Sequence, residues 1–320
     1  MEETNDWSQI KDDYKNISLL LGNGFSLMFN EKFDYNSLYE HSKSNFSKEL
    51  NSIFEKFKTT NFEKVLSYLT LSKKINRLLN IDTSTIDKLI FEIKEGKWNS
   101  IYDTHPKPSE IDKKLLGSVS QTLKSFSTIF TTNYDLFLYY SIMNLSGIFG
   151  DMFSESHEKP NHLKFNKNDM KRNKYIFYLH GCLFLSDNFN STSKIIKQSS
   201  DTDLLERIKV EVETPFFITV FVTEGSSEEK LKSISYNDYL SFSFQHFKDD
   251  PNETILIFGH SLSEQDNHIV EILDNYYKKC IICLYFSNKE EEIKLKKKYL
   301  MKFNKTDVIF VDSKTVFRNK

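Results

Sequence analysis

Polar side chains that could do acid–base chemistry follow two short apolar segments of the chain. The sequence FSTIFTTNYD (residues 126–135) contains Asn133 and Asp135 at its end, and the apolar residues 175–179 are followed by His180. A carboxamide can orient a water molecule, and an imidazole readily exchanges a proton near neutral pH. Simpler explanations remain open, since Asn133 or Asp135 could cap the following helix and a lone histidine is commonly a hydrogen-bonded core residue.

Glycine-containing turns follow two other apolar segments. Residues 17–21 (ISLLL) lead into GNGFS (residues 22–26), and residues 254–258 lead into GHSL (residues 259–262). Glycine lets the backbone approach a phosphate, and the start of a helix supplies N–H donors to it. Leu27 stands where a dinucleotide fingerprint has its third glycine, so an ordinary strand-to-helix turn explains residues 22–26 equally well.

The elements that position these turns are predicted from the apolar pattern. Segments rich in β-branched and aromatic residues alternate with helix-like spacing, which predicts an α/β fold with a Rossmann-like, mostly parallel sheet. The expected strands are residues 17–21, 126–130, 175–179, 215–223, 254–258, 281–286 and 308–311. Ligands bind at the carboxyl edge of such sheets, where all of these turns are expected.

The segment between the first two strands has a different pattern. Residues 31–124 show helical spacing and predict a helical insertion or cap, with residues 1–30 and 125–320 forming the core domain. Residues 227–247 predict one long helix later in the core.

Two polar segments are predicted as loops. Residues 147–173 carry His157 and His162, which we expect at the surface, and residues 186–203 are rich in Ser, Asn, Lys and Asp. Neither segment is expected to contribute to the sheet.

The composition excludes several classes of function. The chain has 320 residues with 43 Lys and Arg against 45 Asp and Glu, so its net charge of −2 argues against nucleic-acid binding. We find no apolar segment long enough for a membrane span and no signal-peptide core, so we expect a cytoplasmic protein. Cys280 and Cys283 form a lone CxxC inside an apolar segment, which indicates core cysteines rather than a metal site.

In chain order, the strand-end motifs are GNGFS, TTNYD, LHG, GHSL, SN and a terminal VD. This series resembles the sirtuin-type NAD-binding core, whose motifs run GAGxS, TQNxD, HG, GTS and a later Asn. The resemblance covers residues 17–26 and the chain from residue 125 onward. It is also similar to a bacterial sirtuin-like family in which FxTNYD, LHG, a VTEG-type strand and FGHSL recur, and which is associated with anti-phage defence by destruction of NAD.

The resemblance implies that NAD+ is the substrate and that no metal is needed. The catalytic residues it implies are Asn133, Asp135 and His180. The residues it implies for binding the cofactor are Gly22, Asn23, Gly24, Ser26, Thr132, Gly259, Ser261 and Asn288. Of these, the glycine turn of residues 22–26 would hold the pyrophosphate, and the last three would hold the adenosine side.

The resemblance therefore predicts an NAD+ glycohydrolase that cleaves the nicotinamide–ribose bond. The four-cysteine zinc module of protein-deacylating sirtuins is missing after the HG motif, which puts a protein deacylase in doubt. A non-catalytic sensor of NAD or ADP-ribose remains an alternative. So does a GxSxG-like nucleophile elbow at residues 259–263, although its chain order lacks a suitable acid and histidine. Metal binding by His260, Asp266 and His268 is less favoured still, because these residues straddle a helix start.

The resemblance also implies how the protein would be controlled. Defence NADases stay silent until triggered, so it implies a homo-oligomer or an ATPase partner. We expect neither membrane nor nucleic-acid partners.

Overall fold

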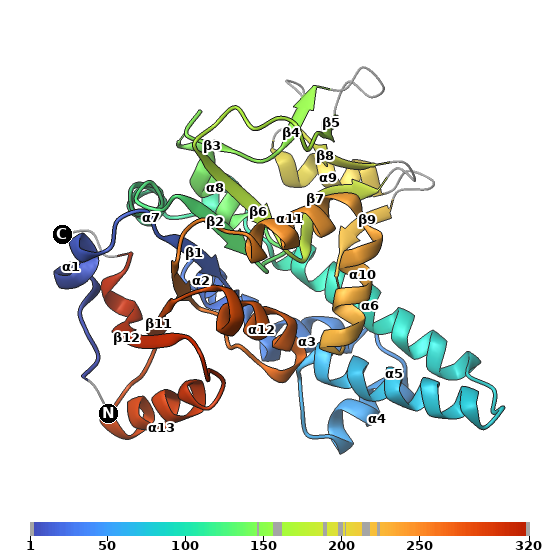
Figure 1. Cartoon of the computed structure of the whole chain (residues 1–320). Coiled ribbons are helices and arrows are strands. Elements are labelled where there is room, and N and C mark those ends of the chain that lie inside the picture. Colours follow the sequence, from blue (N-terminus) through green and yellow to red (C-terminus); the bar gives the residue numbers. More distant parts are fainter. Residues whose placement is uncertain are drawn as a thin grey trace.

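A computed structural model describes residues 3–145, 147–155, 162–187, 191–197, 201, 203–212, 218–222 and 225–317. Within these residues the chain folds as the α/β, Rossmann-like protein that the apolar pattern predicts. Figure 1 shows a central sheet with helices on both faces, a smaller sheet beside it, and a group of helices that extends away from the core.

The central sheet is parallel throughout the part of the chain described. Seven strands follow the order β12-β11-β10-β1-β2-β6-β3, and each neighbouring pair is parallel. Their bounds are β1 (Ser18–Leu21), β2 (Thr128–Thr131), β3 (Phe149–Gly150), β6 (Lys174–Tyr178), β10 (Thr254–Phe258), β11 (Lys279–Leu284) and β12 (Asp307–Asp312). The strand order reverses between β1 and β10, which is where open α/β sheets form a ligand crevice.

Alternate residues of the strands pack into two cores, one on each face of the sheet. Leu19 and Leu21 of β1 join one buried cluster, while Leu20 joins the other. This alternation follows from the two-residue repeat of a strand, and burial on both faces explains why these strands read as continuous apolar segments. Cys280 and Cys283 are three positions apart in a strand, so their side chains point to opposite faces, and they lie in different clusters. Both are free thiols.

An antiparallel sheet that the sequence did not predict lies beside the first. Among the described residues it has five strands in the order β4-β5-β8-β7-β9. They are β4 (Phe153–Glu155), β5 (His162–Phe165), β7 (Gly181–Asp187), β8 (Thr192–Ile195) and β9 (Ile218–Phe221). β9 belongs to the segment of residues 215–223 that we had expected in the parallel sheet, but it pairs antiparallel with β7.

The two polar segments predicted as loops therefore contain strands. β4 and β5 lie in residues 147–173, and β8 lies in residues 186–203. These strands are three or four residues long and carry polar side chains, so they lack an apolar strand pattern. His162 is buried in β5, which corrects its expected place at the surface, and His157 lies outside the described residues.

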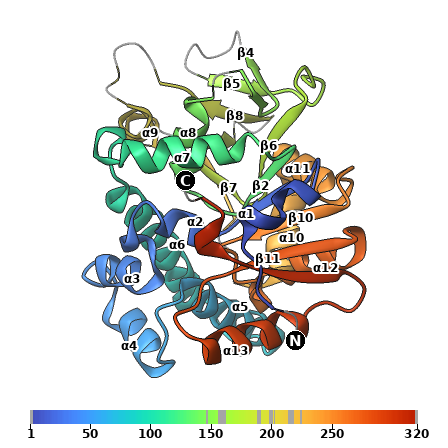
Figure 2. The same cartoon turned by 90° about the vertical axis from the view of Figure 1, so that its left-hand side faces the viewer.

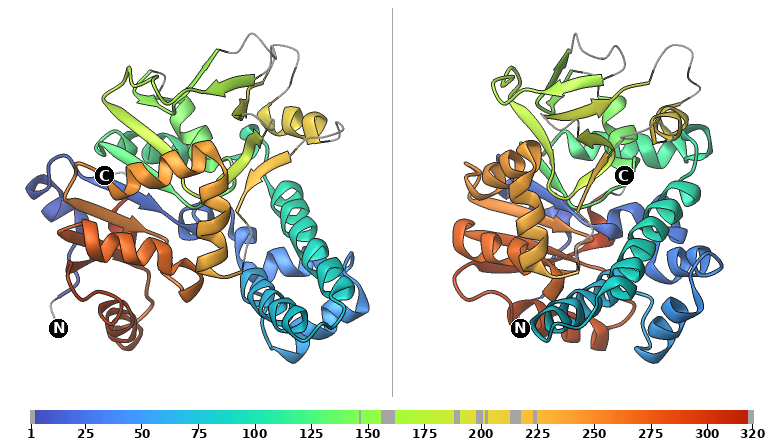
Figure 3. Two further views of the ribbon diagram at one scale, coloured as in Figure 1. Left: turned by 45° about the vertical axis from the view of Figure 1, so that its right-hand side comes forward. Right: turned by 90° about the vertical axis from the view of Figure 1, so that its right-hand side faces the viewer.

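Helices fill the segment between β1 and β2. They are α3 (Tyr35–Lys43), α4 (Lys48–Lys56), α5 (Phe62–Leu78), α6 (Ser84–Thr104) and α7 (Lys113–Leu123). α5 begins at the N-cap Asn61, whose side chain accepts hydrogen bonds from the N–H groups of Glu63 and Lys64. Figure 3 shows α5 and α6 side by side, extending away from the sheets. α7 instead packs on α8 (Phe137–Met143), close to the core.

The remaining helices surround the two sheets, as Figure 2 shows from the side. They are α1 (Trp7–Ile10), α2 (Asn23–Leu27), α9 (Leu204–Val212), α10 (Ser227–Tyr236), α11 (Asp238–Lys248), α12 (Asn267–Tyr276) and α13 (Lys289–Leu300). The helix predicted over residues 227–247 is broken at Asn237, whose side chain caps α11 by accepting from Leu240 N. None of the helices in the described residues is both long and apolar enough to cross a membrane.

Candidate active site

A cavity of about 410 Å³ opens at the carboxyl edge of the parallel sheet, where the strand order reverses. Its volume is within the usual range of small-molecule sites. Residues that follow β1, β2, β6 and β10 line it together with side chains from α5, α6 and α10. Of the residues predicted for the site, those that line it are Asn23, Gly24, Thr132, Asn133, Asp135, His180, Gly259 and Ser261.

The two glycine turns pack directly against each other at this edge. Gly24 N donates to Gly259 O at 2.8 Å, and a Cβ on Gly24 would lie 2.6 Å from Gly259 Cα. Gly259 also has a φ of +68°, which side chains disfavour. Gly22 N donates to Phe258 O at 2.9 Å. Contacts between the two backbones are therefore one sufficient reason for these glycines, and their approach to a ligand stays a prediction.

Asn133 is held in one orientation by its amide nitrogen. Nδ2 donates to Gly22 O at 3.0 Å and to Ser26 Oγ at 2.9 Å, and the residue is buried. Because a carbonyl oxygen can only accept, the NH₂ group must be the one that faces Gly22. Both of its hydrogens are used in this way, which leaves Oδ1 as the group that Asn133 can offer to a water or a hydroxyl.

Asp135 is fixed by the same turn. Its Oδ2 accepts from the Ser26 hydroxyl and its Oδ1 accepts from Phe137 N, the first N–H of α8, at 2.9 Å. The N-cap position of α8 is the next residue, Leu136, so Asp135 bonds the start of the helix without being its N-cap. Burial raises the pKa of Asp135 to about 6, although these hydrogen bonds oppose the shift. The carboxyl group thus changes charge close to neutral pH while it lines the cavity.

His105 supports this loop and was not singled out by the sequence. Its Nε2 accepts from Leu136 N at 2.9 Å, and its Nδ1 lies 2.9 Å from Pro106 O. Because Nε2 accepts a hydrogen bond, it carries no proton, and because Nδ1 faces a carbonyl oxygen, it must donate. The ring is therefore the neutral tautomer protonated on Nδ1. Burial lowers the pKa of His105 to about 4, in agreement with a neutral ring.

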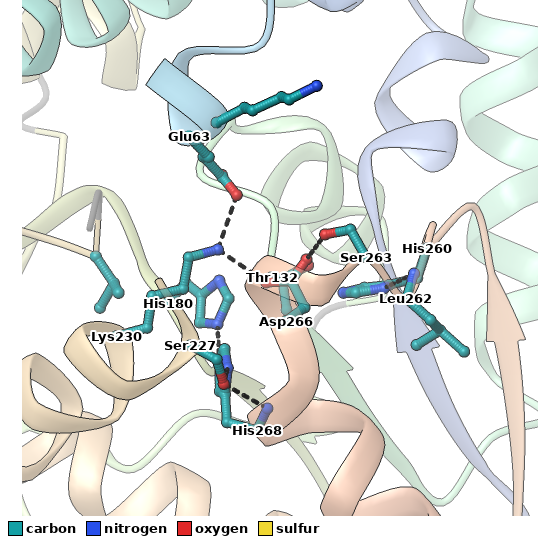
Figure 4. A network of polar contacts seen from close by, with 12 residues as sticks. Glu63, Thr132, His180, Ser227, Lys230, His260, Leu262, Ser263, Asp266 and His268 are labelled. Carbon is teal, nitrogen blue, oxygen red and sulfur yellow. Dashed lines mark hydrogen bonds and ion pairs between the residues drawn. The ribbon is translucent and has the colours of Figure 1, made fainter. Parts of the chain in front are cut away.

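His180 lies against a second histidine. Its Nε2 is 2.9 Å from His268 Nε2, and His268 Nδ1 is 3.1 Å from Ser227 Oγ (Figure 4). Ser227 Oγ also accepts from the backbone N–H of His268 at 2.8 Å. Burial, followed by the nearby charge of Lys230, holds the pKa of His180 well below its usual value. Burial likewise lowers the pKa of His268 to about 4.

A buried cluster of charges forms another wall of the cavity. Lys230 Nζ donates to Glu63 Oε2 and to Asp266 Oδ1, each at 2.8 Å, and Lys97 Nζ donates to Glu63 Oε1 at 3.1 Å. Figure 4 shows Lys230 between the two carboxylates. Burial opposes the charge on Lys230, but the carboxylates of Glu63 and Asp266 raise its pKa overall. Lys97 also lies over the ring of Tyr134, 4.6 Å from its centroid.

The sequence analysis did not identify this cluster. Glu63 comes from α5 and Lys97 from α6, so the helical segment between β1 and β2 supplies half of it. Glu63 stands three residues after Thr60, and this capping-box spacing by itself offers a local explanation for the glutamate, although the observed N-cap is Asn61. One signal for the cluster is the position of Lys97, which lies among the buried, mostly apolar residues of α6, where a lysine needs a charged partner.

Three donor atoms in the cluster lie close enough together to suggest a metal. One atom each from His180, Asp266 and His268 lies within 4.8 Å of the others. However, Asp266 already accepts from Lys230 through Oδ1 and from Ser263 through Oδ2. Two carboxylates and two ammonium groups balance in charge here, so a divalent cation would add two uncompensated positive charges to a buried site. The donor set therefore does not suit a resident metal.

Three residues predicted for the site do not line the cavity. Gly22 and Ser26 lie beneath it, where they bond Asn133 as described. Asn288 caps α13 by accepting from Glu291 N at 2.9 Å. The residues from β11 and α13, and between them, that do line the cavity are Cys283, Leu284, Tyr285, Leu295 and Tyr299.

Comparisons with known proteins give a family but no activity. The family model described as "Domain of unknown function (DUF4917)" matches residues 19–316. No curated protein matches the chain. A solved structure described as "Structural Basis for the Mechanism and Regulation of Sir2 Enzymes" matches with 12% sequence identity and a TM-score of 0.38, over 97% of this chain and 92% of that one. At that TM-score the similarity carries no argument about function.

Proposed function

The chain belongs to the family of the domain of unknown function DUF4917, and we propose that it hydrolyses NAD+ at the bond between nicotinamide and ribose. The products are nicotinamide, ADP-ribose and a proton. One observation carries the proposal: the polar groups that follow β1, β2, β6 and β10 line one cavity at the switch point of the sheet. The order of their motifs along the chain, which resembles that of sirtuins, supports NAD+ as the ligand.

The residues at this cavity have the chemistry that the reaction needs. Nicotinamide leaves with the bonding electron pair, which neutralises its ring and leaves a cationic, oxocarbenium-like sugar. Asp135 places a carboxylate in the cavity, and a negative charge there stabilises such a cation. Asn133 Oδ1 accepts a hydrogen bond from the attacking water, and His180 accepts the proton that the water loses.

The ligand would lie across the two turns. The segment of Asn23 and Gly24 and the segment of Gly259 and Ser261 pack against each other and both line the cavity, and we assign the pyrophosphate to this region. The nicotinamide ribose would lie deeper, beside Asn133 and His180. No step of this scheme requires a metal.

The test is nicotinamide release from NAD+ by the purified protein. Hydrolysis in water enriched in oxygen-18 should place the label on ADP-ribose, and omission or addition of an acyl-lysine peptide should make no difference. Release that depends on the peptide would instead identify a deacylase. Binding of NAD+ without release would identify the sensor.

We also propose a role for the activity in anti-phage defence, which rests on the sequence resemblance alone. Cells that carry the protein should lose NAD on infection, and cells that carry Asn133→Ala should not. Equal NAD content in the two strains after infection would refute this role.

A further inference from the structure

We propose that His180, His268 and Ser227 form a proton relay that carries the proton of each turnover from the cavity to solvent. The inference rests on the proposed hydrolysis of NAD+, and it assigns His268 and Ser227 a role in that reaction. Neither residue lines the cavity, so both act through His180.

The need for a relay follows from the surroundings of His180. Each hydrolysis releases one proton, and the imidazole is the base beside the sugar. The ring is almost completely buried, and the ammonium of Lys230 lies in the same cluster. An imidazolium that persisted there would be opposed by burial and by a like charge. A base in this position works better if it gives up one proton as it takes another.

The geometry provides for this exchange. His180 Nε2 faces His268 Nε2 at 2.9 Å, and His268 Nδ1 faces Ser227 Oγ at 3.1 Å, so three groups form a continuous chain. Ser227 is only half-buried at the start of α10, which gives the chain an outer end near solvent. Ser227 Oγ is fixed by the backbone N–H of His268, so the hydroxyl hydrogen is free to point outward.

The proton count is balanced in each step. Before transfer, His180 carries its proton on Nε2 and His268 carries its own on Nδ1, where it donates to Ser227. The water then gives a proton to His180 Nδ1, the Nε2 proton passes to His268, and the Nδ1 proton of His268 passes to Ser227 Oγ. Ser227 releases its own hydroxyl proton to solvent. Both rings remain neutral. After the product has left, the reverse shift restores the first tautomers: His180 Nδ1 gives its proton to water in the open cavity, and Ser227 takes one proton from solvent, so that one proton per turnover is released overall.

Burial favours neutral rings over a permanently charged pair, while the neighbouring charges act in opposite directions. Lys230 from α10, Asp266 before α12, His260 after β10 and Glu63 from α5 all act on His268, and the ring of Phe244 from α11 packs on it at 5.8 Å. The carboxylates of Glu63 and Asp266 both accept from Lys230. Among the hydrogen bonds described for the rings of His180 and His268, none involves a carboxylate.

The kinetic test replaces His268 with a ring that cannot carry a proton. For His268→Phe we expect kcat for nicotinamide release to fall about 100-fold with KM changed less than about 2-fold, because a lost proton transfer costs that much without affecting binding. Added imidazole should restore part of the rate of His268→Ala, which a merely structural role would not allow. His246→Phe, at a histidine outside the cavity, should keep the wild-type kcat. An unchanged kcat in His268→Phe would overturn the relay.

A spectroscopic test separates the relay from the proposed function. In the relay, removal of the Ser227 hydroxyl is felt at His180 through two hydrogen bonds. Ser227→Ala should therefore shift the ¹⁵N resonances of the His180 ring while leaving those of His105 in place. An unmoved His180 signal overturns the relay whether or not the protein releases nicotinamide. A shifted signal in a protein that releases none supports the coupled pair and refutes NAD+ hydrolysis.

Discussion

Glu63 accepts a hydrogen bond from Lys230 at 2.8 Å, although the two residues are 167 positions apart in the chain. The bond joins α5, in the helical segment between β1 and β2, to α10 in the core, and both side chains are buried. Asp266 holds the other side of the same ammonium group. The wall of the cavity thus depends on a contact between two parts of the chain that are separate in sequence.

Removal of the ammonium group should destabilise the protein strongly. Lys230→Met leaves Glu63 paired with Lys97 alone and leaves Asp266 with only the hydroxyl of Ser263. Because an uncompensated charge then remains buried, we expect the free energy of unfolding to fall by about 3–5 kcal/mol. The free energy of unfolding in denaturant measures this loss. Lys278→Met is the matched control, because Lys278 pairs with Glu253 in solvent and such pairs contribute about 0–1 kcal/mol. Equal effects of the two substitutions would contradict a buried network.

Alanine should have opposite effects at two glycines. In Gly259→Ala the new Cβ meets Gly24 Cα within 2.6 Å at a φ of +68°, and we expect a loss of about 2 kcal/mol or more. In Gly117→Ala, within α7, nothing lies within 4 Å of the new Cβ, and better helix propensity should add about 0.5–1 kcal/mol. Thermal unfolding of the two variants tests the packing of the glycine turns; a stable Gly259→Ala would count against it.

Activity should rise with pH through the titration of Asp135. The carboxyl group is protonated below its pKa of about 6 and ionised above it, and only the ionised form stabilises a cationic sugar. The kcat/KM for NAD+ should therefore fall on the acid side of about pH 6. Asp135→Asn should be slower than the wild type above about pH 6 and should lack this acid limb. Asp307→Asn, at an exposed strand end, is the control and should keep the acid limb. Loss of the acid limb in Asp307→Asn as well would show that Asp135 is not the group that titrates.

Chelators should leave the activity intact. The group of His180, Asp266 and His268 is already satisfied by Lys230 and by the contact between the histidines. Treatment with EDTA should change the rate of nicotinamide release less than about 2-fold, whereas loss of a bound metal would abolish it. Restoration of a lost rate by added zinc would show that the charge argument is wrong.

The sequence predicts the parallel sheet and the meeting of its turns because both follow from local patterns. Continuous apolar segments identify β1, β2 and β10, and parallel strands bring their carboxyl ends to one edge. The antiparallel sheet escaped prediction since short polar strands such as β8 show no apolar pattern, although β8 pairs with β7, the strand before it in the chain. Asn288 shows another limit: its N-cap spacing to Glu291 is visible in the sequence, but a motif order that resembles sirtuins favoured a ligand role.

The buried charge cluster could not be predicted for a different reason. Glu63 and Lys97 sit in helices whose charged residues normally face solvent, and the sequence does not state which of many lysines a glutamate will meet. Only the tertiary arrangement brings α5, α6 and α10 to the same cavity. His268 was similarly ambiguous, because its partner His180 lies 88 positions earlier.

The most direct measurement is nicotinamide release from NAD+ by the wild-type protein, Asn133→Ala and His180→Ala, each shown to be folded by its unfolding transition. We expect release by the wild type and a loss of about 100-fold or more in both variants, because one loses the group that orients water and the other loses the base. Turnover by both variants at the wild-type rate, or folded wild-type protein that releases no nicotinamide, would contradict the proposed active site.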